Sequence, residues 1–218
     1  MFLGHFAVSF GAKKPAPAVS LGTMFLAAQF VDLLWPLFLL LGLEHASIEP
    51  GNTAVTPLDF YDYPFTHSLA GTLLWSCVLG LAYFAVKRNV RNAVAVGLAV
   101  SSHWFLDFLT HRPDLPLWFS GGPHVGLGLW NSVAGTVVVE VGIFIAGLML
   151  YIKSTTAKDK IGSIGFWSLA AFLALAYVAN LVGPPPPDMS SIAVVGNATW
   201  LLVAWAYWVD RHRTARVA

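Results

Sequence analysis

Long apolar segments limit what this chain can fold into. A helix that crosses a lipid bilayer needs about 20 mostly apolar residues, and six stretches of the 218-residue sequence meet that condition. In hydrocarbon the backbone polar groups must be paired within the protein, which favours helices. The predicted spans are Val19–Gly42, Pro64–Val86, Asn92–Thr110, Gly128–Ile152, Ile164–Val182 and Ile192–Val209.

The composition agrees with this reading. The chain is 57% hydrophobic and 11% charged, whereas about a quarter of the residues in a soluble domain are charged. We therefore expect an all-α integral membrane protein, a single polytopic domain over residues 1–218 with six transmembrane helices. The opening segment 1–12 is apolar but too short to cross, and it predicts a half-inserted or interfacial helix. The net charge of +1 indicates no nucleic-acid partner, so the expected partner is the lipid bilayer.

The basic residues fall unequally between the loops. With six spans, eleven of the twelve lysines and arginines lie on one side, and only Arg112 lies on the other. The positive-inside rule assigns the basic side to the cytoplasm, so we expect both termini there. Lys13 and Lys14 follow the first apolar segment instead of preceding it, which predicts that no signal peptide is removed.

Few ionisable residues lie within the predicted spans, and the default interpretation of such residues is functional. They are Asp32, His67, His103, Asp107 and Glu140, with His111 at the outer rim. His103, Asp107 and His111 are each four residues apart, so they share one helix face. At a rise of about 1.5 Å per residue, most of the group falls in the outer half of the membrane. His5 can join it only if the N-terminal segment inserts.

Three interpretations of this cluster compete. It is a structural network that fixes helix packing, a proton or ion pathway, or a metal site. Imidazole and carboxylate groups together suit Zn²⁺ and neighbouring transition metals. We favour the metal site.

Four short motifs carry a resemblance to a known family. In order they read GHFAVSFG, FVDLLWP, FTHSLAG and SHWFLD. Over residues 1–116 this pattern resembles the YdjM-like family of inner-membrane metal-dependent hydrolases. The resemblance implies a bacterial inner-membrane protein and, position by position, a metal-centred set of His5, Asp32, His67, His103 and Asp107. That family has Pro-Asp-x-Asp where this chain has Val-Asp-Leu-Leu at 31–34, so one carboxylate is absent.

The working hypothesis is a hydrolase that acts on an amphiphilic lipid ester or phosphoester. One or two divalent ions, zinc first and manganese or iron as alternatives, would activate a water on the outer side of the membrane. Asp32 or Glu140 would be the general base, although Glu140 equally suits a hydrogen bond in helix packing. Substrate contacts are predicted at His111, Arg112 and Asn131, with an Arg112–Asp114 interfacial pair as the alternative for the arginine.

Two other classes of function stay open. One is a transporter of metal ions or protons, which should offer polar groups that reach both faces of the membrane. The other is a non-catalytic subunit of a larger membrane complex. The predicted polar residues gather toward one side, which favours the hydrolase.

Overall fold

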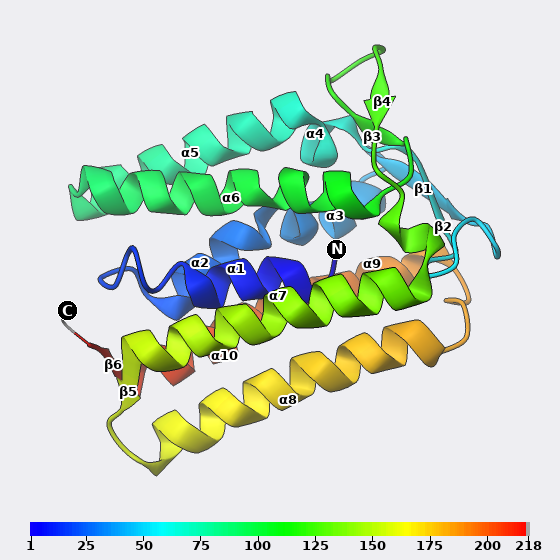
Figure 1. The fold of residues 1–218 in the computed structure, drawn as a ribbon. Coiled ribbons are helices and arrows are strands. Elements are labelled where there is room, and N and C mark those ends of the chain that lie inside the picture. The colour runs from blue at the N-terminus through cyan, green and yellow to red at the C-terminus, as the bar shows by residue number, and fades with distance from the viewer. Residues whose placement is uncertain (217–218) are drawn as a thin grey trace.

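The computed structural model describes residues 1–216, and most of them lie in helices (Figure 1). The helices are α1 (Leu3–Gly11), α2 (Leu21–Ala28), α3 (Phe30–Leu40), α4 (Pro64–His67), α5 (Leu69–Lys87), α6 (Val90–Thr110), α7 (Val133–Ser154), α8 (Lys160–Val182), α9 (Met189–Asn197) and α10 (Thr199–Arg211), with a 3₁₀ turn, η1 (Leu129–Asn131), before α7. Three two-stranded antiparallel sheets pair β1 (His45–Ile48) with β2 (Leu58–Asp62), β3 (Leu115–Pro116) with β4 (His124–Val125), and β5 (Thr155–Ala157) with β6 (Arg213–Ala215).

Several helices are long and apolar enough to cross a bilayer. Five such spans occur within the described residues: α5, α6, α7, α8, and α9 with α10 taken together. The pair α2 and α3 passes the same test as a sixth span, although it is bent by 53°. These helices indicate a membrane protein. The exact count of six stays a prediction.

Four predicted spans differ from the helices that form. The sixth is divided at Ala198 between α9 and α10, and the other three are interrupted at a polar residue or a glycine. The first is broken at Gln29, where α2 ends and α3 begins. The second is divided by Ser68, whose extended backbone (ψ 154°) ends α4 and whose hydroxyl caps α5. The fourth starts late, because Gly128 adopts a left-handed conformation (φ 72°) and η1 follows it. In each of these three cases a local polar or glycine residue interrupts a stretch that hydropathy alone reads as continuous.

The two ends of the bundle carry different connections. Figure 1 places the α5–α6 turn, the segment 12–20, β5 and β6 together at one end, and β1 to β4 at the other. The basic loops therefore share one end of the molecule, as the charge distribution predicts. Which end faces the cytoplasm stays a prediction.

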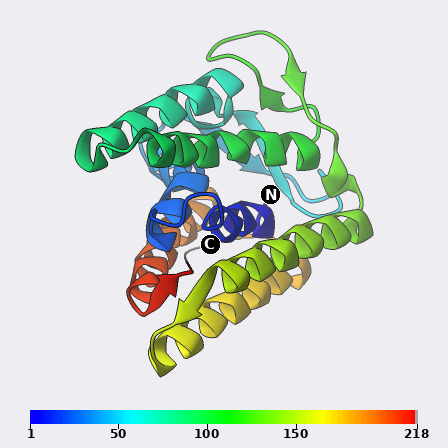
Figure 2. The ribbon, with the colours of Figure 1, turned by 60° about the vertical axis from the view of Figure 1, so that its left-hand side comes forward.

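Helix α1 lies inside the bundle, between α6 on one side and α7 on the other (Figure 2). Its aromatic residues Phe6 and Phe10 pack in the main apolar core with Phe25, Tyr151 and Phe166. A Cβ atom on Gly147 of α7 would come within 2.8 Å of the Ala7 Cα atom. Only glycine therefore permits this approach, which brings the start of α1 to the centre of the molecule.

Candidate metal centre

The five residues predicted as metal ligands come together in the structure. They arrive from four helices: His5 from α1, Asp32 from α3, His67 from α4, and His103 and Asp107 from α6. Two overlapping triads, His5–His103–Asp107 and Asp32–His67–His103, each have ligand atoms within 4.8 Å of one another. Ligand atoms of a tetrahedral zinc ion lie about 3.4 Å apart, given bonds of about 2.0–2.1 Å. The spacing therefore fits a transition-metal ion in either triad, and this His/Asp group could hold a metal ion.

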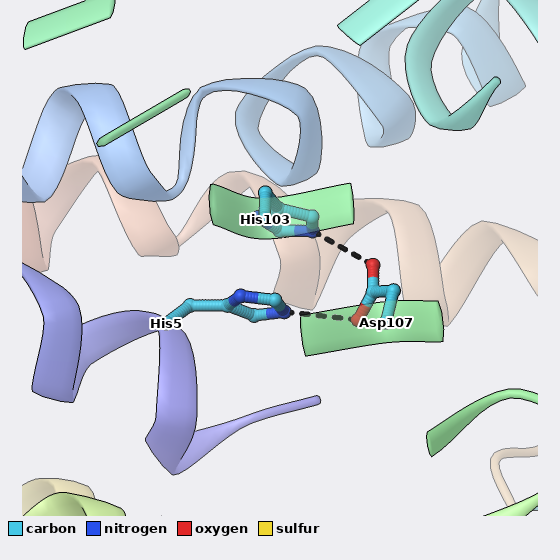
Figure 3. A group of neighbouring side chains, drawn as sticks. All are labelled: His5, His103 and Asp107. Carbon is cyan, nitrogen blue, oxygen red and sulfur yellow. Dashed lines mark hydrogen bonds and ion pairs between the residues drawn. The ribbon is translucent and has the colours of Figure 1, made fainter. Parts of the chain in front are cut away.

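Asp107 belongs to the first triad, and its two oxygens face different residues (Figure 3). The Oδ1 atom lies 3.1 Å from His5 Nε2 and 2.5 Å from the amino group of Met1. The Oδ2 atom lies 3.1 Å from His103 Nε2 and 4.0 Å from His67 Nε2. One carboxylate thus faces ligands of both triads.

Asp32 closes the second triad. Its Oδ1 atom is 3.2 Å from His67 Nε2 and 3.6 Å from His103 Nε2. The Asp32 side chain is 36% exposed, whereas those of His103 and Asp107 are exposed by 1% and 2%. Among the five predicted ligands, Asp32 is therefore the one that is exposed to a substantial degree.

The break between α2 and α3 orients His103. Ala28 is the last residue of α2, and the final carbonyls of a helix lack intrahelical partners. The carbonyl oxygen of Ala28 accepts a hydrogen bond from His103 Nδ1 at 2.7 Å. Because Nδ1 must carry the proton in that bond, the neutral imidazole presents an unprotonated Nε2 to the centre.

Two buried ring nitrogens test whether a metal fits here. His5 Nδ1 and His103 Nε2 have no hydrogen-bond partner, and buried polar atoms normally have one. The lone pair of His103 Nε2 faces oxygens of Asp32 and Asp107 at 3.6 and 3.1 Å. A lone pair facing two carboxylates is repulsive unless a cation lies between them. The site therefore requires a cation, either a metal ion or a proton, and its imidazole and carboxylate donors fit a transition metal.

Glu140 of α7 caps the beginning of α1. Its Oε2 atom accepts backbone N–H bonds from Phe2, Leu3 and Gly4 at 2.9, 2.6 and 3.4 Å. The first N–H groups of a helix have no intrahelical acceptor and favour a negative charge. Glu140 thus holds α1, and with it His5, in place. These contacts agree with a packing function, and the predicted function as general base stays a prediction.

The residues predicted to contact substrate lie on the β1–β4 side of the centre. His111 is buried, its Nδ1 atom 3.0 Å from Asp114 Oδ1. Arg112 is paired with both Asp59 and Asp114, which matches the alternative of an interfacial pair. Asn131 is exposed in η1. Among the described residues no hydrogen bond links its side chain to the centre, and a substrate function for all three stays a prediction.

An aromatic cluster that includes one residue of β2 adjoins the centre beside His67. It consists of Phe60, Tyr63, His111 and Trp130, here called the aromatic cap. Tyr63 lies 5.2 Å from the His67 ring and 6.1 Å from the His111 ring, measured between centroids. Trp130 lies 4.3 Å from the His111 ring. The aromatic cap therefore packs against the centre beside His67.

Sequence reasoning missed two groups beside predicted ligands, one of which acts through Thr66 and one of which makes a direct contact. Glu44, between α3 and β1, accepts a hydrogen bond from the Thr66 hydroxyl at 2.6 Å, and that hydroxyl lies 2.7 Å from His67 Nδ1. The amino group of Met1 contacts Asp107. The only local signal was a hydroxyl residue directly before a histidine, in FTHS, and nothing in the sequence connects it to Glu44.

Comparison with protein-family models, with curated proteins and with solved structures finds no match. The resemblance to the YdjM-like family therefore stays a prediction that rests on the four motifs.

Proposed function

We propose that this protein is a membrane-embedded, metal-dependent hydrolase. The observation that carries the proposal is the buried Nε2 atom of His103. Its lone pair faces two carboxylates, and a cation between them removes the repulsion. Zinc is the ion we expect, because mixed imidazole and carboxylate ligands are typical of catalytic zinc sites. When bound, a divalent ion would lower the pKa of a coordinated water from 15.7 to about 7 and polarise the scissile group.

The protein residues divide the remaining work. His5, His67, His103 and Asp107 would hold the ion from the buried side. Asp32 alone is substantially exposed, so water and substrate would reach the centre beside it. A carboxylate at the open side can accept the proton of an attacking water. Glu140 is less suited to that task, because one of its oxygens already accepts three N–H bonds.

The surroundings favour an amphiphilic substrate. The centre lies among long apolar helices, so a lipid ester or phosphoester could approach it from within the bilayer. We further propose a bacterial inner membrane, with six spans, α1 half-inserted, both termini in the cytoplasm and the centre in the outer half. This orientation is supported by the basic loops at one end of the bundle.

A substrate panel tests the reaction class. The purified protein, loaded separately with Zn²⁺, Mn²⁺ or Fe²⁺, is incubated with lipid esters and phosphoesters, with and without chelator. We expect at least one substrate class to be turned over. Chelator and Asp107→Ala should abolish this turnover, whereas His45→Ala, a variant at an exposed residue of β1, should leave it unchanged. Stoichiometric metal without turnover of any substrate would overturn the hydrolase and favour a non-catalytic subunit.

A second function is favoured by one observation on α1. His5, Ser9 and Lys13 occupy the i, i+4 and i+8 positions of α1 and the turn after it, and all three are buried. The Lys13 ammonium pairs with Asp210 at 2.9 Å, so polar groups extend from the centre toward the basic end. Such a path suits proton or metal-ion transport. Flux into proteoliposomes, abolished by Ser9→Ala, would replace the hydrolase with a transporter.

A further inference from the structure

Glu44 is a buried carboxylate with no function in the centre described so far. It is 1% exposed, and burying a charge is costly unless hydrogen bonds compensate. Both of its oxygens are used on one residue. The Oε1 atom accepts the Thr66 backbone N–H at 2.8 Å, and the Oε2 atom accepts the Thr66 hydroxyl at 2.6 Å.

The direction of these hydrogen bonds follows from which groups can donate. A hydroxyl has one proton, and Thr66 gives it to the carboxylate of Glu44. The same hydroxyl oxygen lies 2.7 Å from His67 Nδ1, and it can only accept there. His67 must therefore carry a proton on Nδ1, which makes Nε2 the ring nitrogen that is available to a metal ion. That atom lies 3.2 Å from Asp32 Oδ1, inside the centre.

We propose that Glu44 is a positioning residue, which acts through Thr66 to fix His67 in the tautomer that can bind a metal ion. His103 is fixed in the same tautomer by the Ala28 carbonyl. Partners of this kind behind a ligating histidine set its tautomer and raise its basicity. The positioning function rests on the proposed metal centre, because it assumes that His67 binds a metal ion. The tautomer of His67 can nevertheless be measured without metal.

Glutamine at position 44 should reverse the chain of hydrogen bonds. The Thr66 N–H can only donate, so the amide oxygen would turn toward it and the amide NH₂ toward the hydroxyl. The hydroxyl would then accept from the amide and donate to His67 Nδ1. The proton of His67 would move to Nε2, and the ligand lone pair would be lost from the centre.

The experiment measures the tautomer and the metal affinity on the same proteins. The full chain is labelled with ¹⁵N-histidine, and the His67 signals are identified by their loss in His67→Gln. In the metal-free wild type we expect a protonated Nδ1, and in Glu44→Gln an unprotonated Nδ1 with the proton on Nε2. Titration with Co²⁺, followed by its visible spectrum, should show an affinity about 10- to 100-fold lower in Glu44→Gln.

Matched variants separate positioning from general damage. Thr66→Ser keeps the hydroxyl and should behave as wild type, whereas Thr66→Val removes it and should weaken Co²⁺ binding as Glu44→Gln does. Glu49→Gln changes an exposed glutamate of the same connection and should have no effect. If Glu44→Gln fails to fold, the Thr66→Ser and Thr66→Val pair decides.

The outcomes distinguish the two proposals. An unchanged His67 tautomer in Glu44→Gln, or equal Co²⁺ affinity in Thr66→Ser and Thr66→Val, overturns the positioning function even if the wild type binds metal. A switched tautomer in a protein that binds no transition metal supports the positioning function and overturns the metal centre.

Discussion

His103 donates its Nδ1 proton to the carbonyl oxygen of Ala28, across 2.7 Å. The acceptor exists because α2 ends at Ala28 and the chain bends by 53° into α3. A straight helix would use this carbonyl internally, four residues later. The bend therefore does two things: it supplies a partner for His103, and it places Asp32 in the first turn of α3 beside it.

Removal of a predicted ligand should abolish tight metal binding. We expect His103→Ala and Asp107→Ala to lower the Zn²⁺ affinity by at least about 10- to 100-fold. Mutation of a residue that only supports a ligand already costs that much, and loss of the ligand itself should cost no less. Metal analysis of the purified proteins after loading and dialysis measures this. His45→Ala is the matched control, since His45 forms an exposed pair with Asp62. A wild type without stoichiometric transition metal would contradict the metal centre.

Glu140 should act on the centre through α1. We expect Glu140→Ala to lower the free energy of unfolding by about 1–3 kcal/mol, because three N–H groups, two of them fully buried, lose their acceptor. It should also weaken metal binding, because His5 is displaced. A double-mutant cycle tests this connection: the Zn²⁺ affinity is measured for the wild type, Glu140→Ala, His5→Ala and the double variant. Once His5 is absent, Glu140→Ala should cost little further affinity, and additive losses would contradict the connection.

Labelling should place the two ends of the bundle on opposite sides of the membrane. Single cysteines at Lys87 and Asp114, in a Cys77→Ser background, are probed with an impermeant maleimide in intact spheroplasts. We expect Asp114→Cys to react and Lys87→Cys to react only after permeabilisation, because basic loops stay in the cytoplasm. Equal reaction of both without permeabilisation would exclude the six-span topology.

Acid should weaken the beginning of α8. The hydrogen bond from His212, followed by that from the Gly162 backbone, lowers the pKa of Asp159 below its usual 3.8. A depressed pKa means that the stabilisation is complete above 3.8 and is lost as the pH falls through the folded-state value. The thermal unfolding midpoint should therefore decline below about pH 4, less steeply in Asp159→Asn. Identical acid profiles for the two proteins would contradict this contribution.

The helical membrane character and the meeting of five polar residues from distant segments could be predicted from sequence, for physical reasons. Apolar length shows directly in the composition, and charged or imidazole groups inside spans are rare enough to stand out. The structure confirms that His5, Asp32, His67, His103 and Asp107 come together. Their function as ligands stays a prediction.

What sequence reasoning missed depends on contacts between distant segments. Glu44 resembles any acidic loop residue until Thr66 is folded against it. The bend at Gln29 and the late start of α7 also escaped notice, because hydropathy averages over the one or two residues that break a helix. Glu140 shows the same limit, since its partners lie on α1 at the other end of the sequence.

The one-sided exposure of Asp32 also has a consequence for kinetics. An ion held by four buried ligands would leave past the fifth, so exchange should be slow in both directions even where affinity is moderate. The metal found in a preparation would then reflect which ion was abundant while the chain folded, instead of the intrinsic affinity order of divalent metals. Protein expressed in a medium enriched in one metal should accordingly still contain mainly that metal after purification.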